Sequence, residues 1–226
     1  MSRYSEVLLL QHAHISLPDR EVLRDIHMTL GEGEFCYIRG RSGSGKSALM
    51  DGLYGLNILS GNVVKVLGRE SPIIDRQELA LYRRSIGYIS KKYELLEGMT
   101  VFQNLDRILA NIDWPVASHR EMRINEVLHM AGLADLQSEL ISRLSEGQEQ
   151  KLRICRSILN KPKLILADAP TAGLDTQSVE EVMDLLINLA AESRASIIWA
   201  TASEFIPERY PARSYLCADG TITEMG

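Results

Sequence analysis

Cysteines are few in this sequence, and long apolar runs are absent. Cys36, Cys155 and Cys217 are the only cysteines among 226 residues, and their wide spacing fits neither a metal site nor a disulfide framework. No segment approaches the roughly 18 apolar residues of a membrane-spanning helix. The N-terminus lacks a signal-peptide pattern, because only residues 7–10 are continuously apolar. We therefore expect a cytoplasmic protein that reaches a membrane only through a partner.

Basic charge is also scarce. The chain holds 25 lysines and arginines against 30 acidic residues, which gives a formal net charge of −5. This balance, with no basic run, argues against a nucleic-acid surface. Hydrophobic residues make up 45% of the chain, enough to bury the core of one domain. No repeat or linker divides the sequence, so we expect a single domain over residues 1–226.

Strand-like and helical segments alternate along the chain. Strands are expected at residues 7–10, 22–30, 35–38, 62–67, 86–89, 164–167 and 196–201. Helical patterns cover residues 47–56, 100–159 and 179–191. Near the C-terminus, Asp219-Gly220 predicts the turn of a β-hairpin. The alternation predicts an α/β protein with a largely parallel sheet, into which a helical lobe at about residues 92–159 is inserted.

The most specific motif fits the phosphate-binding loop G-x-x-x-x-G-K-[ST], also called Walker A or the P-loop, at every fixed position. Its residues are Gly40, Arg41, Ser42, Gly43, Ser44, Gly45, Lys46 and Ser47. It lies between a predicted strand and a predicted helix, as the motif requires. Its backbone N–H groups and Lys46 would hold phosphate oxygens, and the Ser47 hydroxyl would bind Mg²⁺. We expect a nucleoside triphosphate with magnesium; a chance glycine-rich turn is the alternative.

Further motifs follow in order along the chain and resemble those of ABC-type ATPases. Residues 144–148 read L-S-E-G-Q, similar to the L-S-G-G-Q signature, and residues 164–168 resemble a Walker B strand that ends in Asp168. Residues 172–175 resemble the D-loop, and residues 197–201 resemble the strand before the switch position. The resemblance runs from about residue 7 to residue 223, nearly the whole chain.

The resemblance implies the fold, the reaction and the binding residues. Its fold adds N-terminal antiparallel strands to the parallel sheet, and its reaction is ATP plus water to ADP plus phosphate. The working form is a head-to-tail dimer, in which each ATP lies between one subunit's phosphate loop and the other subunit's signature. The first subunit would bind nucleotide through residues 40–48, including Ala48, and through Asp168, which would hold Mg²⁺ with Ser47 directly or through water. The second subunit would contribute Ser145, Glu146, Gly147, Gln148 and Asp175. An alternative role for Ser145, compatible with this one, is the N-cap of the following helix.

Within the family, the sequence resembles short bacterial subunits such as the cell-division ATPase FtsE and the lipoprotein-release ATPase LolD, with FtsE the closer. The supporting features are residues 83–87, residues 167–171 and the lack of a C-terminal regulatory domain. This similarity implies an integral-membrane permease or FtsX-like partner at the inner face of the cell membrane. Residues 91–96 would receive it, with Tyr93, Leu95 and Leu96 as candidates; the two leucines could equally be core.

Three positions that the family uses for hydrolysis differ here. Ala169 replaces a catalytic glutamate, Lys91 a glutamine and Ala202 a histidine. Loss of a positioned general base typically lowers a rate by about 10²–10⁴. We therefore expect weak hydrolysis, unless another carboxylate such as Glu204 serves as the base.

Nucleotide affinity is expected to be modest as well. Glu146 places a carboxylate where the signature has glycine, which should weaken the dimer. Ala48 lacks the usual hydroxyl, and His14 is the only plausible stacking partner for adenine.

Three functions are compatible with these residues. The leading hypothesis is the ATP-binding subunit of a membrane ABC complex for transport or cell division, with reduced hydrolysis. The alternative is an ATP-binding regulatory or scaffold subunit that pairs with a catalytically intact ABC ATPase. A non-transport ABC ATPase acting on DNA or iron–sulfur assembly is disfavoured by the acidic charge, the short chain and the lack of a cysteine ligand set. The substrate and the choice between homodimer and heterodimer stay open.

Overall fold

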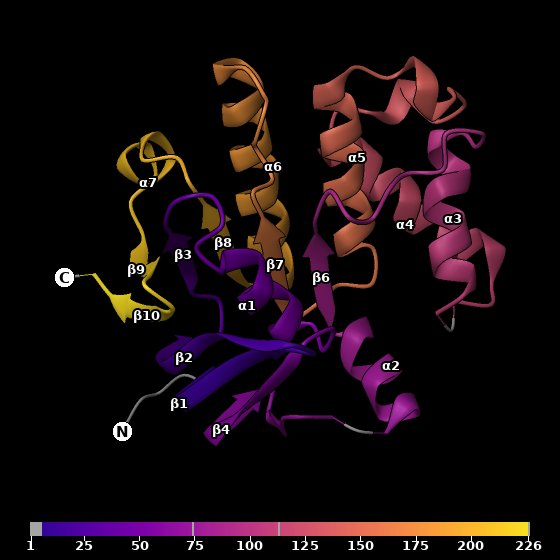
Figure 1. The fold of residues 1–226 in the computed structure, drawn as a ribbon. Helices are drawn as coiled ribbons and strands as arrows, with labels where there is room; N and C mark the ends of the chain where they lie inside the picture. The colour runs from indigo at the N-terminus through magenta and orange to yellow at the C-terminus, as the bar shows by residue number, and fades with distance from the viewer. Residues whose placement is uncertain (1–5, 74, 113, 226) are drawn as a thin grey trace.

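A six-stranded sheet forms the centre of the molecule in the computed structural model, which describes residues 6–73, 75–112 and 114–225 (Figure 1). In sheet order the strands are β10 (Thr221–Glu224), β9 (Arg213–Ala218), β3 (Phe35–Arg39), β8 (Ser196–Thr201), β7 (Leu164–Asp168) and β6 (Ile86–Ile89). All pairs are parallel except the β9–β10 hairpin. Strands β6, β7 and β8 are almost entirely buried, as expected for parallel strands covered on both faces. The predicted α/β fold is confirmed. The ends of the predicted domain, residues 1–5 and 226, lie outside the described residues.

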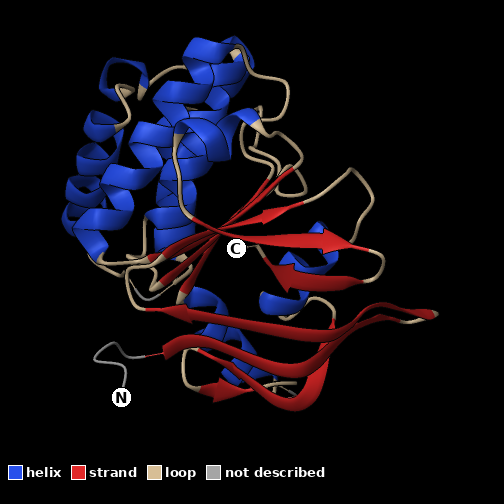
Figure 2. Ribbon diagram, turned by 90° about the vertical axis from the view of Figure 1, so that its left-hand side faces the viewer, coloured by secondary structure: helices blue, strands red, loops and turns tan. Residues whose placement is uncertain are grey.

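A second, antiparallel sheet packs beneath the first (Figure 2). Its order is β2 (Arg20–Gly31), β1 (Glu6–Leu17), β4 (Ile58–Val66) and β5 (Arg69–Glu70). The N-terminal antiparallel strands implied by the family resemblance are therefore present. Strand β1 continues well past the predicted residues 7–10. The polar residues His12 and His14 interrupt the apolar run from which the strand was predicted, although Ala13 and Ile15 beside them are fully buried.

Helix α1 (Lys46–Leu53) lies between the two sheets and contacts strands of both. Its Leu49, Met50 and Leu53 are completely buried in the core that joins the sheets. Burial of three such side chains stabilises this arrangement by roughly 1.5–3 kcal/mol each. Because the phosphate-loop segment leads directly into α1, packing of this helix fixes where the loop sits.

The predicted helical lobe consists of three α-helices and two short 3-10 turns, at the right of Figure 1. They are α3 (Val101–Ala110), α4 (Ala117–Met130), η1 (Ala134–Leu136), η2 (Ile141–Arg143) and α5 (Glu146–Ile158). Leu105, Leu109, Val127, Leu128 and Ile154 form its interior and are completely buried. The lobe shares this core with α6 (Thr176–Ser193), which covers the six-stranded sheet.

Two helices were not predicted from the sequence. In α2 (Arg76–Arg84) only Tyr82 is buried, and most residues of the helix are polar or charged, so it has little apolar content to mark it in the sequence. Its start is instead set by Asp75, whose side chain accepts a hydrogen bond from the Glu78 N–H at 2.8 Å. Helix α7 (Phe205–Arg209) has only five residues, too few to show a period.

The C-terminal hairpin matches its prediction. Asp219 and Gly220 have φ of 50° and 74°, the left-handed pair that a type I′ turn requires. No helix in the described ranges is long and apolar enough to cross a membrane.

Candidate functional site

The phosphate-loop segment connects β3 to α1 at the carboxyl ends of the parallel strands. Gly40 and Gly45 have φ of 153° and 110°, and both are closely packed. A Cβ on Gly40 would lie 2.3 Å from the Cys217 carbonyl oxygen, and one on Gly45 would lie 2.8 Å from Leu23 Cδ2. Both the backbone angles and the space therefore require glycine here.

Lys46 spans this loop. Its ammonium donates hydrogen bonds of 2.7 Å to the carbonyl oxygens of Gly40 and Arg41. Burial lowers the pKa of Lys46, while the nearby Asp168 carboxylate opposes the shift. A phosphate oxygen in the loop would offer the ammonium a full negative charge in place of two carbonyl dipoles.

Ser47 and Asp168 connect the beginning of α1 to the end of β7. The Ser47 hydroxyl donates a hydrogen bond of 3.1 Å to Asp168 Oδ1. Burial raises the pKa of Asp168, and the hydrogen bond from Ser47 partly offsets this. A hydroxyl and a carboxylate within hydrogen-bonding distance are the oxygen donors that Mg²⁺ prefers, so this pair fits the predicted metal.

Two of the three altered catalytic positions face the same cavity. Ala169 and Ala202 line a space of about 310 Å³ at the ends of β7 and β8. The other residues around it are Thr171, Ala172, Leu174, Thr176, Val179, Thr201, Ser203, Phe205 and Ile206. None of these described lining residues carries an acid or a base that titrates near neutral pH. Ala169 itself has a left-handed backbone, with φ of 49°.

Glu204 and Gln103 differ in their relation to the site. Glu204 is exposed and lines a neighbouring cavity of about 620 Å³ together with residues 40–44 of the phosphate loop. It therefore stays a candidate for an alternative base. Gln103 lies at the start of α3, where its side chain accepts a hydrogen bond of 2.9 Å from the Thr100 N–H. It caps a helix and does not replace the missing glutamine.

The residues expected to bind nucleotide across a dimer cap two helices. Ser145 Oγ accepts from the Gln148 N–H at 3.2 Å, and Gln148 Oε1 accepts from the Ser145 N–H at 2.9 Å. This capping box confirms the alternative role of Ser145 at the N-terminus of α5. Asp175 caps α6 by accepting from the Ser178 N–H at 3.0 Å. Its hydrogen bonds with Ser178, of which that from the hydroxyl is the strongest, lower the pKa of Asp175.

In one subunit this second set stands apart from the phosphate loop. Within the described ranges, no hydrogen bond of Ser145, Gln148 or Asp175 reaches residues 40–47. Gly147 is close to α6, because a Cβ on it would lie 3.2 Å from Ser178 Oγ. Contact of these residues with a nucleotide therefore stays a prediction that requires a second subunit.

Ala48 and His14 are two of the positions at which contacts to the nucleotide are expected to be weak. Ala48 packs half-buried against the core between the sheets. His14 lies on β1, half-exposed, with Nδ1 3.4 Å from Glu21 Oε2. Its role as an adenine platform stays a prediction.

A cleft of about 630 Å³ lies between α3 and α5 of the helical lobe and the elements α2 and β6. Three tyrosines line it, with ring centroids 5.0 Å apart for Tyr54 and Tyr88 and 5.6 Å apart for Tyr88 and Tyr93. Arg83 and Arg156 also face it, and burial lowers the pKa of Arg156 to about 10. Of these residues only Tyr93 was predicted from the sequence to receive a partner, because the cleft is formed by several elements that no local pattern brings together.

The segment predicted to receive a partner contains one core residue. Leu95 is only 6% exposed and belongs to the core, whereas Leu96 is 45% exposed. The Arg156 guanidinium holds the preceding residues in place by donating to the carbonyl oxygens of Tyr93 and Glu94, at 2.6 and 2.8 Å.

The sequence is similar to ATP-binding proteins of transporters. The profile of the family described as ABC transporter matches residues 23–172. The macrolide export ATP-binding/permease protein MacB of Azoarcus sp. is 38% identical over 187 residues, which are 82% of this chain and 28% of that protein. An uncharacterized ABC transporter ATP-binding protein of Methanocaldococcus jannaschii is 34% identical over 90% of both chains. The chain thus spans little more than a quarter of the MacB protein and most of the archaeal one.

Solved structures of such proteins have the same fold. The cbiO1 protein of Clostridium perfringens, part of the ABC transporter complex cbiONQ, superposes with a TM-score of 0.87 at 25% identity, covering 96% of this chain and 86% of the other. The ATP-binding cassette MJ0796, a dimer bound to ADP and Pi, superposes with a TM-score of 0.83 at 27% identity, covering 96% and 97%.

Proposed function

The chain belongs to the ATP-binding domains of ABC transporters, and from this premise we propose that it binds MgATP as a subunit of a membrane ABC complex and hydrolyses it slowly. The observation that carries the proposal is the pairing of Ser47 with Asp168 next to Lys46. Phosphate-binding amides, a mobile cation and an oxygen pair for Mg²⁺ meet there at one edge of the sheet. Mg²⁺ would supply charge neutralisation of the phosphates, and this chain would hold it through Ser47 and Asp168.

Slow hydrolysis is supported by the cavity around Ala169 and Ala202. A general base must lie within hydrogen-bonding reach of the water that it activates. The described residues lining this cavity offer hydroxyl and apolar groups instead. The binding residues are intact while the reacting ones are not, which favours a subunit in which nucleotide acts mainly by being bound.

We propose that the cleft between lobe and sheet receives the membrane partner. Its tyrosines offer apolar faces, and Arg83 and Arg156 offer cations to an acidic side chain or a helix C-terminus. A permease or FtsX-like protein would place the chain on the cytoplasmic face of the cell membrane. The FtsE-like or LolD-like branch, in cell division or lipoprotein release, is the finer form of this proposal.

The second candidate is a regulatory or scaffold subunit that pairs with a catalytically intact ABC ATPase. The same replaced residues, Ala169, Lys91 and Ala202, support it, because a heterodimer needs only one working site. Either form would use the head-to-tail arrangement, with Ser145 and Gly147 of one subunit near Lys46 of the other.

Single-turnover ATP hydrolysis by the purified protein, with and without Mg²⁺, tests the proposal. Radiolabelled ATP should be retained by the protein in the presence of Mg²⁺ and released mainly as ATP. Failure to retain ATP would overturn the binding function, and rapid release as ADP would overturn slow hydrolysis. Addition of an intact ABC ATPase from the same cell separates the two candidates, since only the regulatory subunit should change that enzyme's rate.

A further inference from the structure

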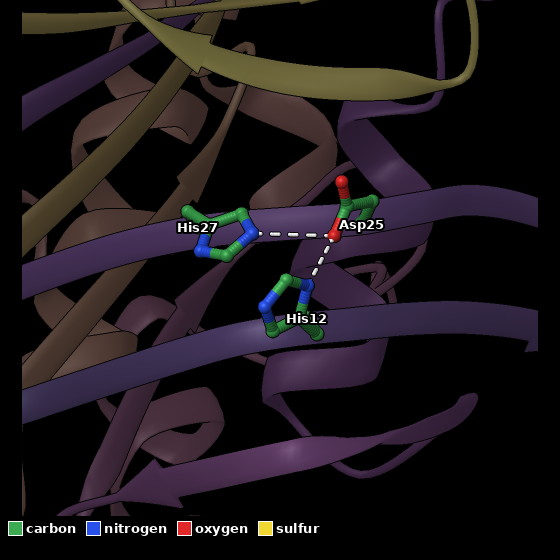
Figure 3. A group of neighbouring side chains, drawn as sticks. All are labelled: His12, Asp25 and His27. Atoms are coloured by element: carbon green, nitrogen blue, oxygen red, sulfur yellow. Dashed lines mark hydrogen bonds and ion pairs between the residues drawn. The ribbon is translucent and has the colours of Figure 1, made fainter.

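Two histidines and an aspartate converge on the exposed surface of the antiparallel sheet (Figure 3). His12 lies on β1, and Asp25 and His27 lie on β2. Asp25 Oδ1 is 2.7 Å from His12 Nδ1 and 3.2 Å from His27 Nε2. The two rings meet edge to face, with centroids 4.4 Å apart. One nitrogen of each ring is therefore directed at the same carboxylate oxygen.

Two β-bulges produce this arrangement. Strand β1 has one residue more than β2 between the pairs Leu10↔Met28 and Ala13↔Ile26. Strand β2 has one residue more than β1 between the pairs Ala13↔Ile26 and Ile15↔Leu23. The second bulge compensates the first, so the strands regain their register. Asp25 and His27 are two residues apart on β2 and share its outward face, because side chains alternate between faces. A regular β1 would direct His12 toward the core with Leu8 and Leu10, and the bulge on β1 turns it outward, beside them.

Both bulged residues have a left-handed backbone. His12 and Asp25 each have φ of 49°, in the left-handed region, where histidine, aspartate and asparagine occur more often than other non-glycine residues. Glycine would form either bulge without the strain of a left-handed backbone. The sequence instead has a histidine and an aspartate at the two positions, which are the residues whose side chains meet.

We propose that His12, Asp25 and His27 form a binding site for a divalent transition metal ion of the Zn²⁺ type. Two imidazole nitrogens and one carboxylate oxygen are a common three-ligand set for Zn²⁺, with water in the fourth position. Mg²⁺ and Ca²⁺ prefer oxygen ligands, so the two imidazoles select against them. The site lies on a different layer from Ser47 and Asp168 and does not depend on the proposed ATP function.

The observed distances suit such an ion. Zn²⁺ binds nitrogen and carboxylate oxygen at about 2.0–2.2 Å, which in a tetrahedral site places ligand atoms about 3.3 Å apart. One ligand atom from each of the three residues lies within 4.8 Å of the others. Rotation of exposed side chains is enough to open the 2.7 Å contact, and no backbone change is needed.

Calorimetric titration of the nucleotide-free protein with ZnCl₂ tests the proposal. Excess Mg²⁺ in the buffer occupies sites made only of oxygen ligands, so that Zn²⁺ does not bind there. The three cysteines are buried and therefore do not compete for Zn²⁺. The variants are His12→Asn and Asp25→Asn, because asparagine tolerates a left-handed backbone, and His27→Gln on the regular part of β2. The matched control is His119→Asn, an exposed histidine on α4.

Wild type and His119→Asn should each bind one Zn²⁺ per chain, and each of the three site variants should lose at least about tenfold in affinity. Zn²⁺ should also raise the unfolding temperature of wild type and control alone, because the metal cross-links β1 to β2. Equal Zn²⁺ affinity in all five proteins, or no binding by wild type, would overturn the site. His27→Gln alone decides the result if either bulge variant fails to fold.

Discussion

Lys91 and Glu146 approach the same point above the backbone of Gly173. Glu146 Oε1 lies 3.4 Å and Lys91 Nζ lies 3.9 Å from the position that a Cβ on Gly173 would occupy. Both residues depart from the family's pattern, and their charges are opposite. Because both side chains lie beside Gly173, we expect the ammonium to offset part of the repulsion between this carboxylate and a triphosphate.

This proximity predicts non-additive effects on MgATP-dependent dimerisation. Lys91→Gln alone should weaken the dimer, because Glu146 keeps its charge without a counter-ion. Lys91→Gln with Glu146→Gly should restore or exceed wild-type dimerisation, by a coupling of roughly 0.5–3 kcal/mol. Light scattering over a protein concentration series measures it, and Glu97→Gln serves as an exposed acidic control. If the effects of the single changes on dimerisation add up to the effect of the double change, the two charges do not interact.

Lys46→Ala should reduce MgATP affinity below detection while leaving the fold intact. The ammonium contacts the carbonyl oxygens of the first two loop residues, and its loss removes a charge-assisted contact to phosphate. Isothermal titration calorimetry gives the affinity. Lys163→Ala, at the opposite end of β7 from Asp168, is the control. Equal affinity in wild type and Lys46→Ala would show that nucleotide binds elsewhere.

Asp168 predicts a pH dependence of Mg²⁺ binding. Because burial raises its pKa, the carboxylate takes up a proton at a higher pH than an ordinary aspartate. Mg²⁺-dependent ATP affinity should therefore decline as the pH falls toward that raised pKa, and Asp168→Asn should remove this dependence of the affinity on pH.

In the metal-free protein, ionisation of Asp168 has the opposite effect, because it lowers the stability of the fold. Ionised Asp168 lowers the stability above its unfolded-state pKa, so Asp168→Asn should raise the unfolding temperature at neutral pH. A lower unfolding temperature would contradict the burial argument.

Local sequence predicted the site better than it predicted contacts between distant segments. The glycine pattern and Lys46 depend on a few adjacent residues, so the phosphate loop was identified from sequence alone. The approach of Lys91 to Glu146 depends on how the lobe packs against the core, which no local pattern records. Neither of the two paired bulges has a local signal either, because they break the alternation by which strands are recognised. Helix α2 was missed for a related reason, since capping by Asp75 rather than apolar burial defines it.

Restoring the family's catalytic residues should raise the hydrolysis rate. The changes Ala169→Glu and Ala202→His place a base and an imidazole at the cavity that now lacks them, and Lys91→Gln adds the family's amide outside its lining. A gain of about 10²-fold or more is expected from the base alone. Steady-state phosphate release measures it, with Lys46→Ala added to the triple variant as the control for contaminating enzymes. Brisk wild-type hydrolysis that Glu204→Gln abolishes would instead identify Glu204 as the base.

The proposed slow hydrolysis predicts how the subunits assemble. If hydrolysis opens the nucleotide-bound dimer, a subunit that hydrolyses slowly should stay closed once MgATP is bound. We expect a monomer without nucleotide and a partial, persistent dimer with MgATP, detected by light scattering at high protein concentration.

Ser145→Arg should block this dimer, because its bulk would fill the γ-phosphate position across the interface. Ser145 also caps α5, and loss of a cap alone typically lowers stability by about 1 kcal/mol. Ser145→Thr is therefore the matched control, since threonine keeps the capping hydroxyl and should still dimerise. If Ser145→Arg still dimerises, the signature residues do not lie in the dimer interface. A wild-type protein that stays monomeric at saturating MgATP would exclude a self-sufficient homodimer and favour pairing with a different ATPase subunit.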